Sequence, residues 1–233
     1  MPAPDSTSGP AIANVSRRGF LAGTAVFVLA SGLPPSALAQ EKEKAFGADA
    51  MPNGWRDDPT LFVAIAADGT VTVTCHRQEM GQGVRTSIAM VVADELEAAW
   101  DRVRVVQAPG DEERYGNQDT DGSRSLRHHY MPMRRVGAAA RTMLEQAAAK
   151  QWGVPVAEVR AQDHRVVHQA SGRALGYGEL ARAASALPVP DRAAVRLKDP
   201  KDFRYIGKET VGLVDNAGIT TGKATYGIDV RLD

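Results

Sequence analysis

The feature that most constrains the fold is a single change of hydrophobic period between residues 61 and 100. Residues 61–65 (LFVAI) and 71–75 (VTVTC) are runs of strand-forming residues on either side of Asp68-Gly69, which predicts a β-hairpin. Beyond Gly81-Gln82-Gly83 the period becomes helical. One helix face would hold Val84, Ile88, Val91, Val92, Leu96 and Trp100. Paired strands followed by an amphipathic helix predict a sheet with helices packed on it.

A second, longer helix is predicted after residues 108–122, which are rich in loop-forming Pro, Gly and Asn. Ser123 or Ser125 is the expected N-cap, and Gly153 with Pro155 ends the helix. Its inward face contains many small residues, so we expect it to pack closely against a sheet or another helix. That face comprises Tyr130, Met133, Gly137, Ala140, Leu144 and Ala147.

The remaining segments complete an α+β prediction: a hairpin-based mixed sheet packed by two main helices. Residues 203–233 are expected to be extended and turn-rich, and residues 230–233 resemble the middle of a strand. The other expected elements are a strand at 103–106, a hairpin or meander at 158–176, a short helix at 179–186 and a Pro-rich connector at 187–202.

The first 40 residues have the order of a secretory signal. Arg17-Arg18 precedes an apolar run that ends near Leu33, and Ala37-Leu38-Ala39 is a small-x-small cleavage site. This apolar run is shorter than a bilayer-spanning helix, which needs about 20 residues. The paired arginines followed by Gly-Phe-Leu predict export of a folded protein by the twin-arginine route to the periplasm. An uncleaved membrane anchor is the alternative; residues 41–58 would form a linker or arm.

Composition excludes several classes of protein. The chain has 28 basic and 28 acidic residues, and removing residues 1–40 leaves a net charge near −1, which argues against nucleic-acid binding. Cys75 is the only cysteine, so it forms no internal disulfide or thiolate-held cluster and is expected to be a buried structural thiol. The five histidines show no metal-site pattern, and no second apolar run could span a membrane.

Gly81-Gln82-Gly83 is the first candidate ligand loop. Free backbone N–H groups at a helix start suit a phosphate or diphosphate, and a glutamine side chain both donates and accepts hydrogen bonds. The alternative is a glycine-rich turn that binds nothing, since neither a Walker loop nor a dinucleotide fingerprint is present. Glu79 could act as a general base or, alternatively, could structure this loop.

Gly122-Ser123-Arg124 is the second candidate loop. Its hydroxyl and guanidinium groups are natural phosphate contacts, whereas the alternative is an N-cap followed by a solvated arginine. If the two helices pack side by side, both starts could converge on one diphosphate-bearing ligand. No Gly-x-Ser-x-Gly elbow of a hydrolase is present.

Together these motifs resemble the molybdenum-binding subunit of the xanthine oxidase family. The branch that they resemble is the β subunit of isoquinoline 1-oxidoreductase and the large subunit of periplasmic aldehyde dehydrogenases. The resemblance spans roughly residues 55–233. It is carried by residues 80–86 (MGQGVRT), 92–96 (VADEL), 122–125 (GSRS), 133–141 (MRRVGAAAR), 152–155 (WGVP), 198–203 (KDPKDF) and 221–229 (TGKATYGID).

The resemblance implies a partial molybdopterin-binding domain over residues 59–186 and the start of a hammerhead-like α/β domain over 203–233. It also implies an oxidoreductase that transfers water-derived oxygen to an aldehyde or N-heterocycle. The cofactor would be molybdenum–molybdopterin cytosine dinucleotide, and the partners a [2Fe–2S] small subunit and a cytochrome c. The residues that would contact the cofactor are Gly81, Gln82, Gly83, Gly122, Ser123 and Arg124.

The chain departs from this family in one respect. Family members continue far beyond the segment that residues 221–229 resemble, and their catalytic glutamate lies in that later part. We therefore assign no catalytic and no metal-binding residue, and we expect an N-terminal portion that is inactive without a complementing C-terminal polypeptide. The alternatives are a non-catalytic remnant or binding module that loads no cofactor, and an unrelated periplasmic ligand-binding domain.

Overall fold

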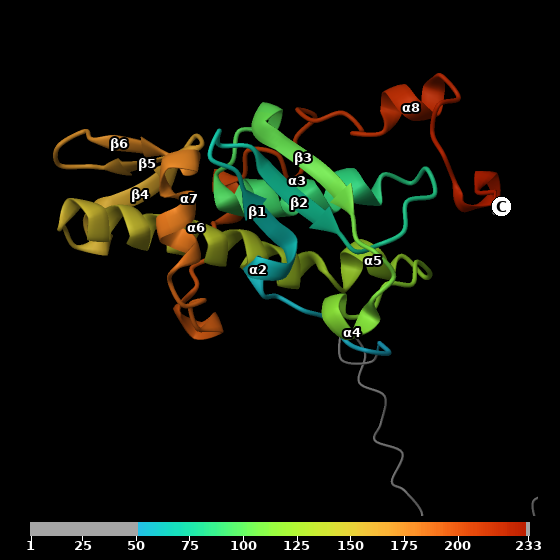
Figure 1. Cartoon of the computed structure of the whole chain (residues 1–233), viewed down its shortest axis with the longest axis horizontal. Coiled ribbons are helices and arrows are strands. Elements are labelled where there is room, and N and C mark those ends of the chain that lie inside the picture. Colours follow the sequence, from blue (N-terminus) through green and yellow to red (C-terminus); the bar gives the residue numbers. More distant parts are fainter. Residues whose placement is uncertain (1–50, 232–233) are drawn as a thin grey trace, which may run out of the picture. The chain divides into compact units, whose positions relative to one another are not determined.

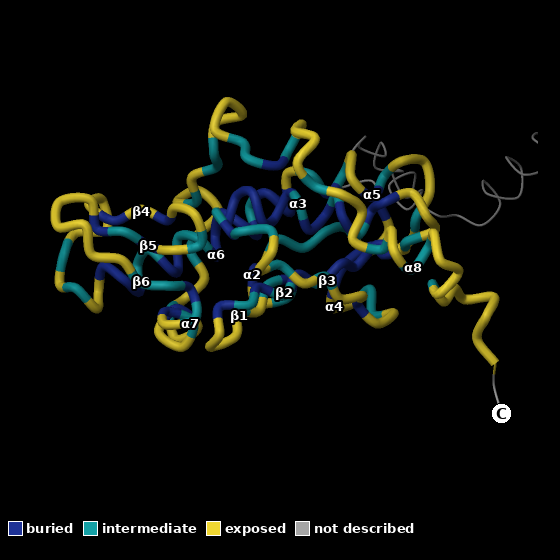
Figure 2. The backbone as a smooth tube through the Cα atoms, turned by 90° about the horizontal axis from the view of Figure 1, so that it is seen from above, coloured by how far each residue is buried: buried dark blue, intermediate teal, exposed yellow. Residues whose placement is uncertain are grey.

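Two helices, α3 (Val84–Leu96) and α6 (Tyr130–Trp152), pack side by side behind a three-stranded sheet (Figure 1). The computed structural model describes residues 51–231. The predicted signal at residues 1–40 and most of the predicted linker lie outside this range. The burial view shows that the core runs along α3 and the middle of α6 (Figure 2).

The sheet in front of these helices is mixed. β1 (Val63–Ile65) runs antiparallel to β2 (Val71–Cys75), and β2 runs parallel to β3 (Val103–Gln107), with α3 in the crossover. Along β2 every second residue, from Val71 to Cys75, is buried, whereas the residues between them are half-buried. This alternation is typical of a sheet that packs on one face only. The hairpin and the mixed sheet predicted from the sequence are confirmed.

The first predicted strand begins later than expected. Residues Pro59–Phe62 form a short helix, α2, and β1 starts only at Val63. Asp58 caps this helix by accepting a hydrogen bond from the Thr60 N–H, and Pro59 occupies the first turn. The Asp-Pro start signal therefore outweighs the strand preference of the apolar residues that follow.

The close approach of α3 and α6 depends on Gly137. A Cβ atom at this position would lie 2.4 Å from the carbonyl oxygen of Val92 on α3. The predicted packing of a small-residue face against another helix is therefore confirmed. At the far end of α6, Gly153 has φ 66° and forms a left-handed C-cap, so the helix ends at the glycine where the sequence predicted its end.

The start of the long helix differs from the prediction. A four-residue helix, α5 (Arg124–Arg127), comes first, and α6 starts only at Tyr130. Ser123 precedes α5 with φ 56° and makes no side-chain cap, while the Ser125 hydroxyl accepts a hydrogen bond from Arg77 instead. Neither serine caps the long helix, because both precede the N-cap position of α6, which is His129.

Two further expectations near this region need correction. The predicted loop 108–122 contains a short helix, α4 (Glu112–Tyr115), which Asp111 caps. Trp100 does not extend the face of α3, because Glu97 ends that helix in a left-handed conformation with φ 59°. Trp100 instead starts a 3-10 turn that leads into β3.

The predicted meander is a second, antiparallel sheet next to one end of α6 (Figure 1). It consists of β4 (Val159–Gln162), β5 (Arg165–His168) and β6 (Ala174–Gly176), and α7 (Tyr177–Ser185) follows it. The fully buried Tyr177 donates a hydrogen bond from its hydroxyl to the Leu96 carbonyl, 2.5 Å away. This bond ties the start of α7, directly after β6, to the end of α3.

Residues 186–231 consist mainly of turns. The 3-10 turns Arg192–Ala194, Pro200–Asp202 and Gly227–Asp229 and the short helix α8 (Asn216–Thr220) are its only regular elements among the described residues. The expected strand near residue 230 is not formed in the part that the structure describes. The predicted division at 187–202 and the hammerhead-like character of 203–233 stay predictions.

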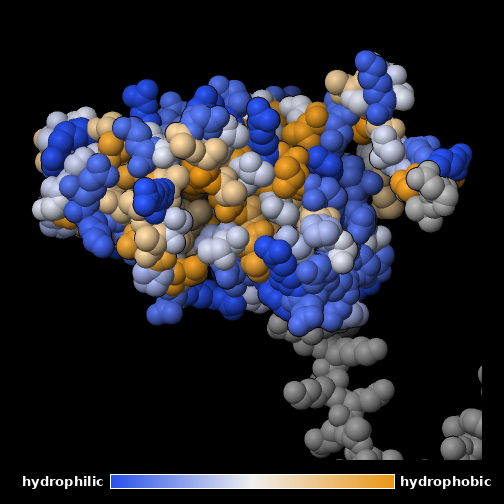
Figure 3. Space-filling model, viewed as in Figure 1, coloured by the Kyte–Doolittle hydropathy of each residue, from blue (hydrophilic) through white to orange (hydrophobic). Residues whose placement is uncertain are grey.

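An open apolar hollow of about 600 Å³ lies between β1, α6 and α7, with Val63, Met143 and Ala184 in its lining. Apolar side chains gather near the middle of the face seen in Figure 3. None of the six predicted cofactor residues lines this hollow. Across residues 51–231, every helix is too short or too polar to cross a bilayer.

Candidate functional site

The two predicted cofactor loops lie side by side beyond the end of β2. The Gln78 N–H donates to the Thr120 hydroxyl at 3.0 Å, and the Arg77 Nε donates to the Ser125 hydroxyl at 3.0 Å. Loop 78–83 leads into α3, and loop 119–123 leads into α5. The structure therefore brings together two segments that are about 40 residues apart in the sequence.

Arg77 anchors this junction, and sequence reasoning missed it. Its side chain is fully buried, and its Nη1 donates to both the backbone carbonyl and the side-chain oxygen of Asn117, each at 2.6 Å. Burial lowers the pKa of Arg77, although the negative charges of Asp119 and Asp121 oppose the shift. The only sequence signal was an arginine two residues after the end of a buried strand.

The Glu79 carboxylate accepts hydrogen bonds from the backbone N–H groups at the start of α3. One carboxylate oxygen accepts hydrogen bonds from the backbone of Gly81 at 2.8 Å and Gly83 at 2.9 Å, and the other accepts from Arg85 at 3.1 Å. Burial alone would raise the pKa of Glu79, but these three donors outweigh it and hold the pKa below its ordinary value. The loop-structuring interpretation of Glu79 is confirmed.

The N–H groups of Gly81 and Gly83 were expected to meet a phosphate, but the chain's own carboxylate already binds them. The Gln82 side chain is also engaged within the loop: its oxygen accepts from the Met80 N–H at 2.6 Å and its amide donates to the Gln78 carbonyl at 2.9 Å. Gly81 has φ 100°, and no atom lies within 4 Å of the position that a Cβ would take. The backbone at Gly81 is therefore open to a ligand.

Gly83 is covered by a distant part of the chain. A Cβ on this residue would lie 2.7 Å from a methyl carbon of Leu213, and φ is 83°. The Val214 N–H donates to the Thr86 hydroxyl at 2.9 Å, and Asp215 pairs with Arg85 at 3.2 Å. Residues 213–215 therefore close one side of the start of α3, and Gly83 is required by packing and backbone conformation.

The second loop is exposed and its charge is compensated. Gly122 and Ser123 are exposed, and Arg124 forms a two-pronged pair with the carboxylate of Asp121. This hydrogen-bonded pairing raises the pKa of Arg124 and lowers that of Asp121. The guanidinium predicted to meet an anion is therefore bound to an acidic neighbour in this structure.

Two fully buried histidines lie behind the loops. The rings of His76 and His129 are 4.7 Å apart in an edge-to-face arrangement, and no described residue is hydrogen-bonded to their ring nitrogens. Burial lowers the pKa of His129 to about 4 and that of His76 well below its ordinary value, so both are neutral near pH 7. The fully buried Cys75 thiol, whose pKa burial raises to about 11, is structural as predicted.

No three His, Cys, Asp or Glu side chains come together as a metal site within the described range of residues.

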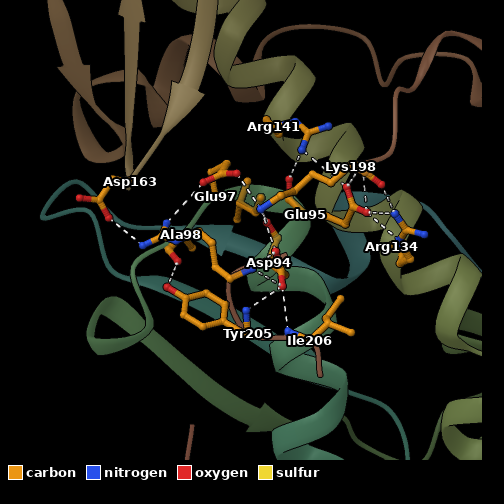
Figure 4. A network of polar contacts seen from close by, with 12 residues as sticks. Asp94, Glu95, Glu97, Ala98, Arg134, Arg141, Asp163, Lys198, Tyr205 and Ile206 are labelled. Carbon is orange, nitrogen blue, oxygen red and sulfur yellow. Dashed lines mark hydrogen bonds and ion pairs between the residues drawn. The ribbon is translucent and has the colours of Figure 1, made fainter. Parts of the chain in front are cut away.

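A buried ionic network links two of the motifs that carried the family resemblance (Figure 4). Asp94 is fully buried and accepts hydrogen bonds from the backbone N–H groups of Arg204, Tyr205 and Ile206 and from the Lys198 ammonium, 2.8 Å away. Burial would raise the pKa of Asp94, but the Ile206 N–H and Lys198 outweigh it and lower the pKa.

Glu95 forms the other half of this network. Its carboxylate pairs with Arg134 at 2.6 Å and with Arg141 at 3.6 Å, and it accepts the Lys198 N–H at 3.0 Å. The motif at 92–96 and the motif at 198–203 are therefore one structural unit. The available signal was two adjacent acidic residues within the apolar pattern of a helix.

A family model for the molybdopterin cofactor-binding domain matches residues 14–227. The chain therefore belongs to the molybdopterin cofactor-binding domain family, as its motifs predicted.

Three curated relatives show which oxidoreductases the chain is similar to. It is 33% identical to the beta subunit of isoquinoline 1-oxidoreductase of Brevundimonas diminuta, over 97% of this chain and 33% of the relative. It is 31% identical to a membrane-bound aldehyde dehydrogenase [pyrroloquinoline-quinone] of Gluconacetobacter polyoxogenes, over 95% and 28%, respectively. It is 33% identical to the B subunit of nicotinate dehydrogenase of Pseudomonas putida, over 93% and 17%. The chain spans a third or less of the length of these relatives.

Two solved structures are also similar. Quinoline 2-oxidoreductase from Pseudomonas putida 86 matches 53% of this chain and 16% of its own, with 22% identity and a TM-score of 0.42. A reconstituted CO dehydrogenase from Oligotropha carboxidovorans matches 52% of this chain and 15% of its own, with 25% identity and a TM-score of 0.43.

Proposed function

We propose that this chain supplies part of the cofactor housing of a molybdenum hydroxylase-type oxidoreductase. The reaction would insert a water-derived oxygen into an aldehyde or an N-heterocycle. The observation that carries the proposal is the family match over residues 14–227, together with relatives named for isoquinoline, aldehyde and nicotinate oxidation. The catalytic glutamate would lie in sequence that these relatives carry beyond the third that this chain spans.

The loops fit such a cofactor in part. The open backbone at Gly81 and the exposed amide of Gln82 suit a flat, hydrogen-bonding pterin. The N–H groups held by Glu79 do not suit a diphosphate at the same time, because two anions would compete for the same donors. When bound, the molybdenum centre would supply the oxygen-transfer and redox chemistry, while these loops would hold and orient the pterin. The proposal includes that the molybdopterin of this cofactor is in its cytosine dinucleotide form.

The proposal also includes location and partners. The signal-like residues 1–40 support export of the folded protein to the periplasm by the twin-arginine route. Electrons would leave through a [2Fe–2S] small subunit and a cytochrome c. Two relatives are each named as one subunit of an enzyme, which supports a multi-subunit assembly.

A labelled-oxygen experiment tests this function. The exported chain, purified with all subunits that accompany it, is given aldehydes and N-heterocycles with a dye acceptor in ¹⁸O-labelled water. The proposal predicts dye reduction and ¹⁸O in the product. An assembly that contains every subunit and a molybdenum cofactor yet oxidises neither class would contradict the proposed function.

Export has a separate test. Replacing Arg17 and Arg18 with lysine should keep the protein in the cytoplasm, because the twin-arginine route requires the paired arginines. Fractionation followed by immunoblotting measures this, and Arg56→Lys, outside the predicted signal, is the control. Unchanged export of the double variant would contradict the predicted route.

A further inference from the structure

We propose that Glu79 is a positioning residue, an internal anion that occupies the start of α3 and sets loop 78–83 so that Gly81 and Gln82 face the cofactor. This inference rests on the proposed function for its ligand. Its structural core, that the N–H groups at this helix start belong to Glu79 and not to a diphosphate, can be tested without the cofactor.

The geometry is that of a backbone anion-binding site in which the anion is a carboxylate of the same loop. Three N–H groups, those of Gly81, Gly83 and Arg85, converge on the two oxygens of one carboxylate at 2.8–3.1 Å. Backbone donors at a helix start favour negative charge, and hydrogen bonds to a charged acceptor are stronger than neutral ones. Only three residues lie between Glu79 and Gly83, so the carboxylate closes the loop on itself.

The same closure fixes Gln82. Its side-chain oxygen accepts from Met80 and its amide nitrogen donates to the Gln78 carbonyl, so the side chain lies across the loop that Glu79 holds. An amide group has two N–H donors, so one N–H of Gln82 can still bind a ligand. Without Glu79, the glycines on either side of Gln82 would leave this orientation undefined.

A diphosphate would compete with Glu79 for these donors. The Arg85 guanidinium does not provide an alternative phosphate contact at this loop, because it pairs with Asp215 at 3.2 Å. The dinucleotide's phosphates are therefore expected to bind elsewhere.

The test is amide hydrogen exchange in the full chain, with Glu79→Ala and a matched control. Glu179→Ala is the control, because the Glu179 carboxylate also accepts a backbone N–H, that of Gly176 at 2.7 Å, but on α7. In Glu79→Ala we expect the amides of Gly81, Gly83 and Arg85 to exchange about tenfold faster or more, because each loses a charge-assisted bond. In Glu179→Ala these three amides should be unchanged.

Inorganic pyrophosphate then shows which anion the site takes. In Glu79→Ala, added pyrophosphate should restore protection of the three amides by filling the vacated site. In the wild-type chain it should leave them unchanged. The inference is overturned if pyrophosphate protects these amides in the wild-type chain, or if Glu79→Ala exchanges like wild type.

Molybdenum content of the assembled enzyme links this result to the cofactor. If the wild-type assembly holds molybdenum, Glu79→Ala should hold severalfold less, and Glu179→Ala should match wild type. Equal content in Glu79→Ala would refute the positioning role. An assembly without molybdenum in any variant would count against the proposed function, whereas the exchange results would still decide what fills the start of α3.

Discussion

At the scale of single residues, the most consequential groups are charged and imidazole side chains in the core. Asp94 and Glu95 lie on a helix that the apolar pattern assigns to the interior, and both are fully buried. Each is compensated by several donors, among them Lys198. A buried carboxylate stays ionised only where such partners replace water. The sequence pattern cannot predict this, because the partners lie about 40 to 110 residues away.

Asp94→Ala should therefore be strongly destabilising. The change leaves three backbone N–H groups without their acceptor and removes one of the two carboxylates that pair with Lys198, which keeps Glu97 at 2.7 Å. Unsatisfied buried donors of this kind should cost about 3–5 kcal/mol of unfolding free energy in total. Urea unfolding of the purified chain measures this loss. Asp101→Ala is the control, since Asp101 is exposed and should change the unfolding free energy by less than about 0.5 kcal/mol. Equal losses in the two variants would contradict the assigned role of Asp94.

The buried histidine pair should make stability depend on pH. The folded-state pKa of His129 is about 4 and that of His76 is well below 6.5, so between about pH 4 and 6.5 the unfolded chain binds more protons. Stability is then fully present above pH 6.5 and falls as the pH drops, by up to about 1.4 kcal/mol per pH unit for each histidine. Urea unfolding across this range measures the slope. His129→Leu should reduce it, and an unchanged slope would contradict the neutral buried pair.

At the scale of elements, local signals predicted most of the helices and strands. The hairpin, α3, α6, the meander and α7 follow from hydrophobic period and from Gly and Pro signals. The errors occurred where a short local signal or a tertiary contact competed with this pattern. Asp58-Pro59 started a helix within a predicted strand, and Arg77 bound Ser125, which was expected to cap a helix. The Asp58-Pro59 helix start could have been recognised in the sequence, whereas the contact between Arg77 and Ser125 could not.

The contact between α3 and α6 gives a prediction at this scale. Gly137→Ala should destabilise the fold by about 1–3 kcal/mol, because the new methyl group would lie 2.4 Å from the Val92 carbonyl oxygen and force the helices apart. Thermal unfolding measures the effect. Gly110→Ala, where no atom lies within 4 Å of the new methyl group, is the control. Equal unfolding temperatures for the two variants would show that the helices do not pack this closely.

At the scale of the whole described molecule, distant segments gather around the start and the end of α3. Residues 213–215 cover its start, and residues 198–206 bind Asp94 and Glu95 near its end. The sequence predicted which loops could meet a cofactor and that they could lie together. It could not predict that Glu79 would use the N–H groups assigned to a phosphate, because several loop conformations are open to residues flanked by glycine.

This chain is proposed to house part of a molybdenum cofactor, with loop 78–83 against it. Metal analysis of the exported assembly, expressed as molybdenum per chain, tests it most directly, with Gln82→Ala compared with Gln169→Ala, an exposed glutamine far from both loops in the sequence. We expect about one molybdenum per chain in the wild type and in Gln169→Ala, and severalfold less in Gln82→Ala. A wild-type assembly that is complete in its subunits but free of molybdenum would contradict it.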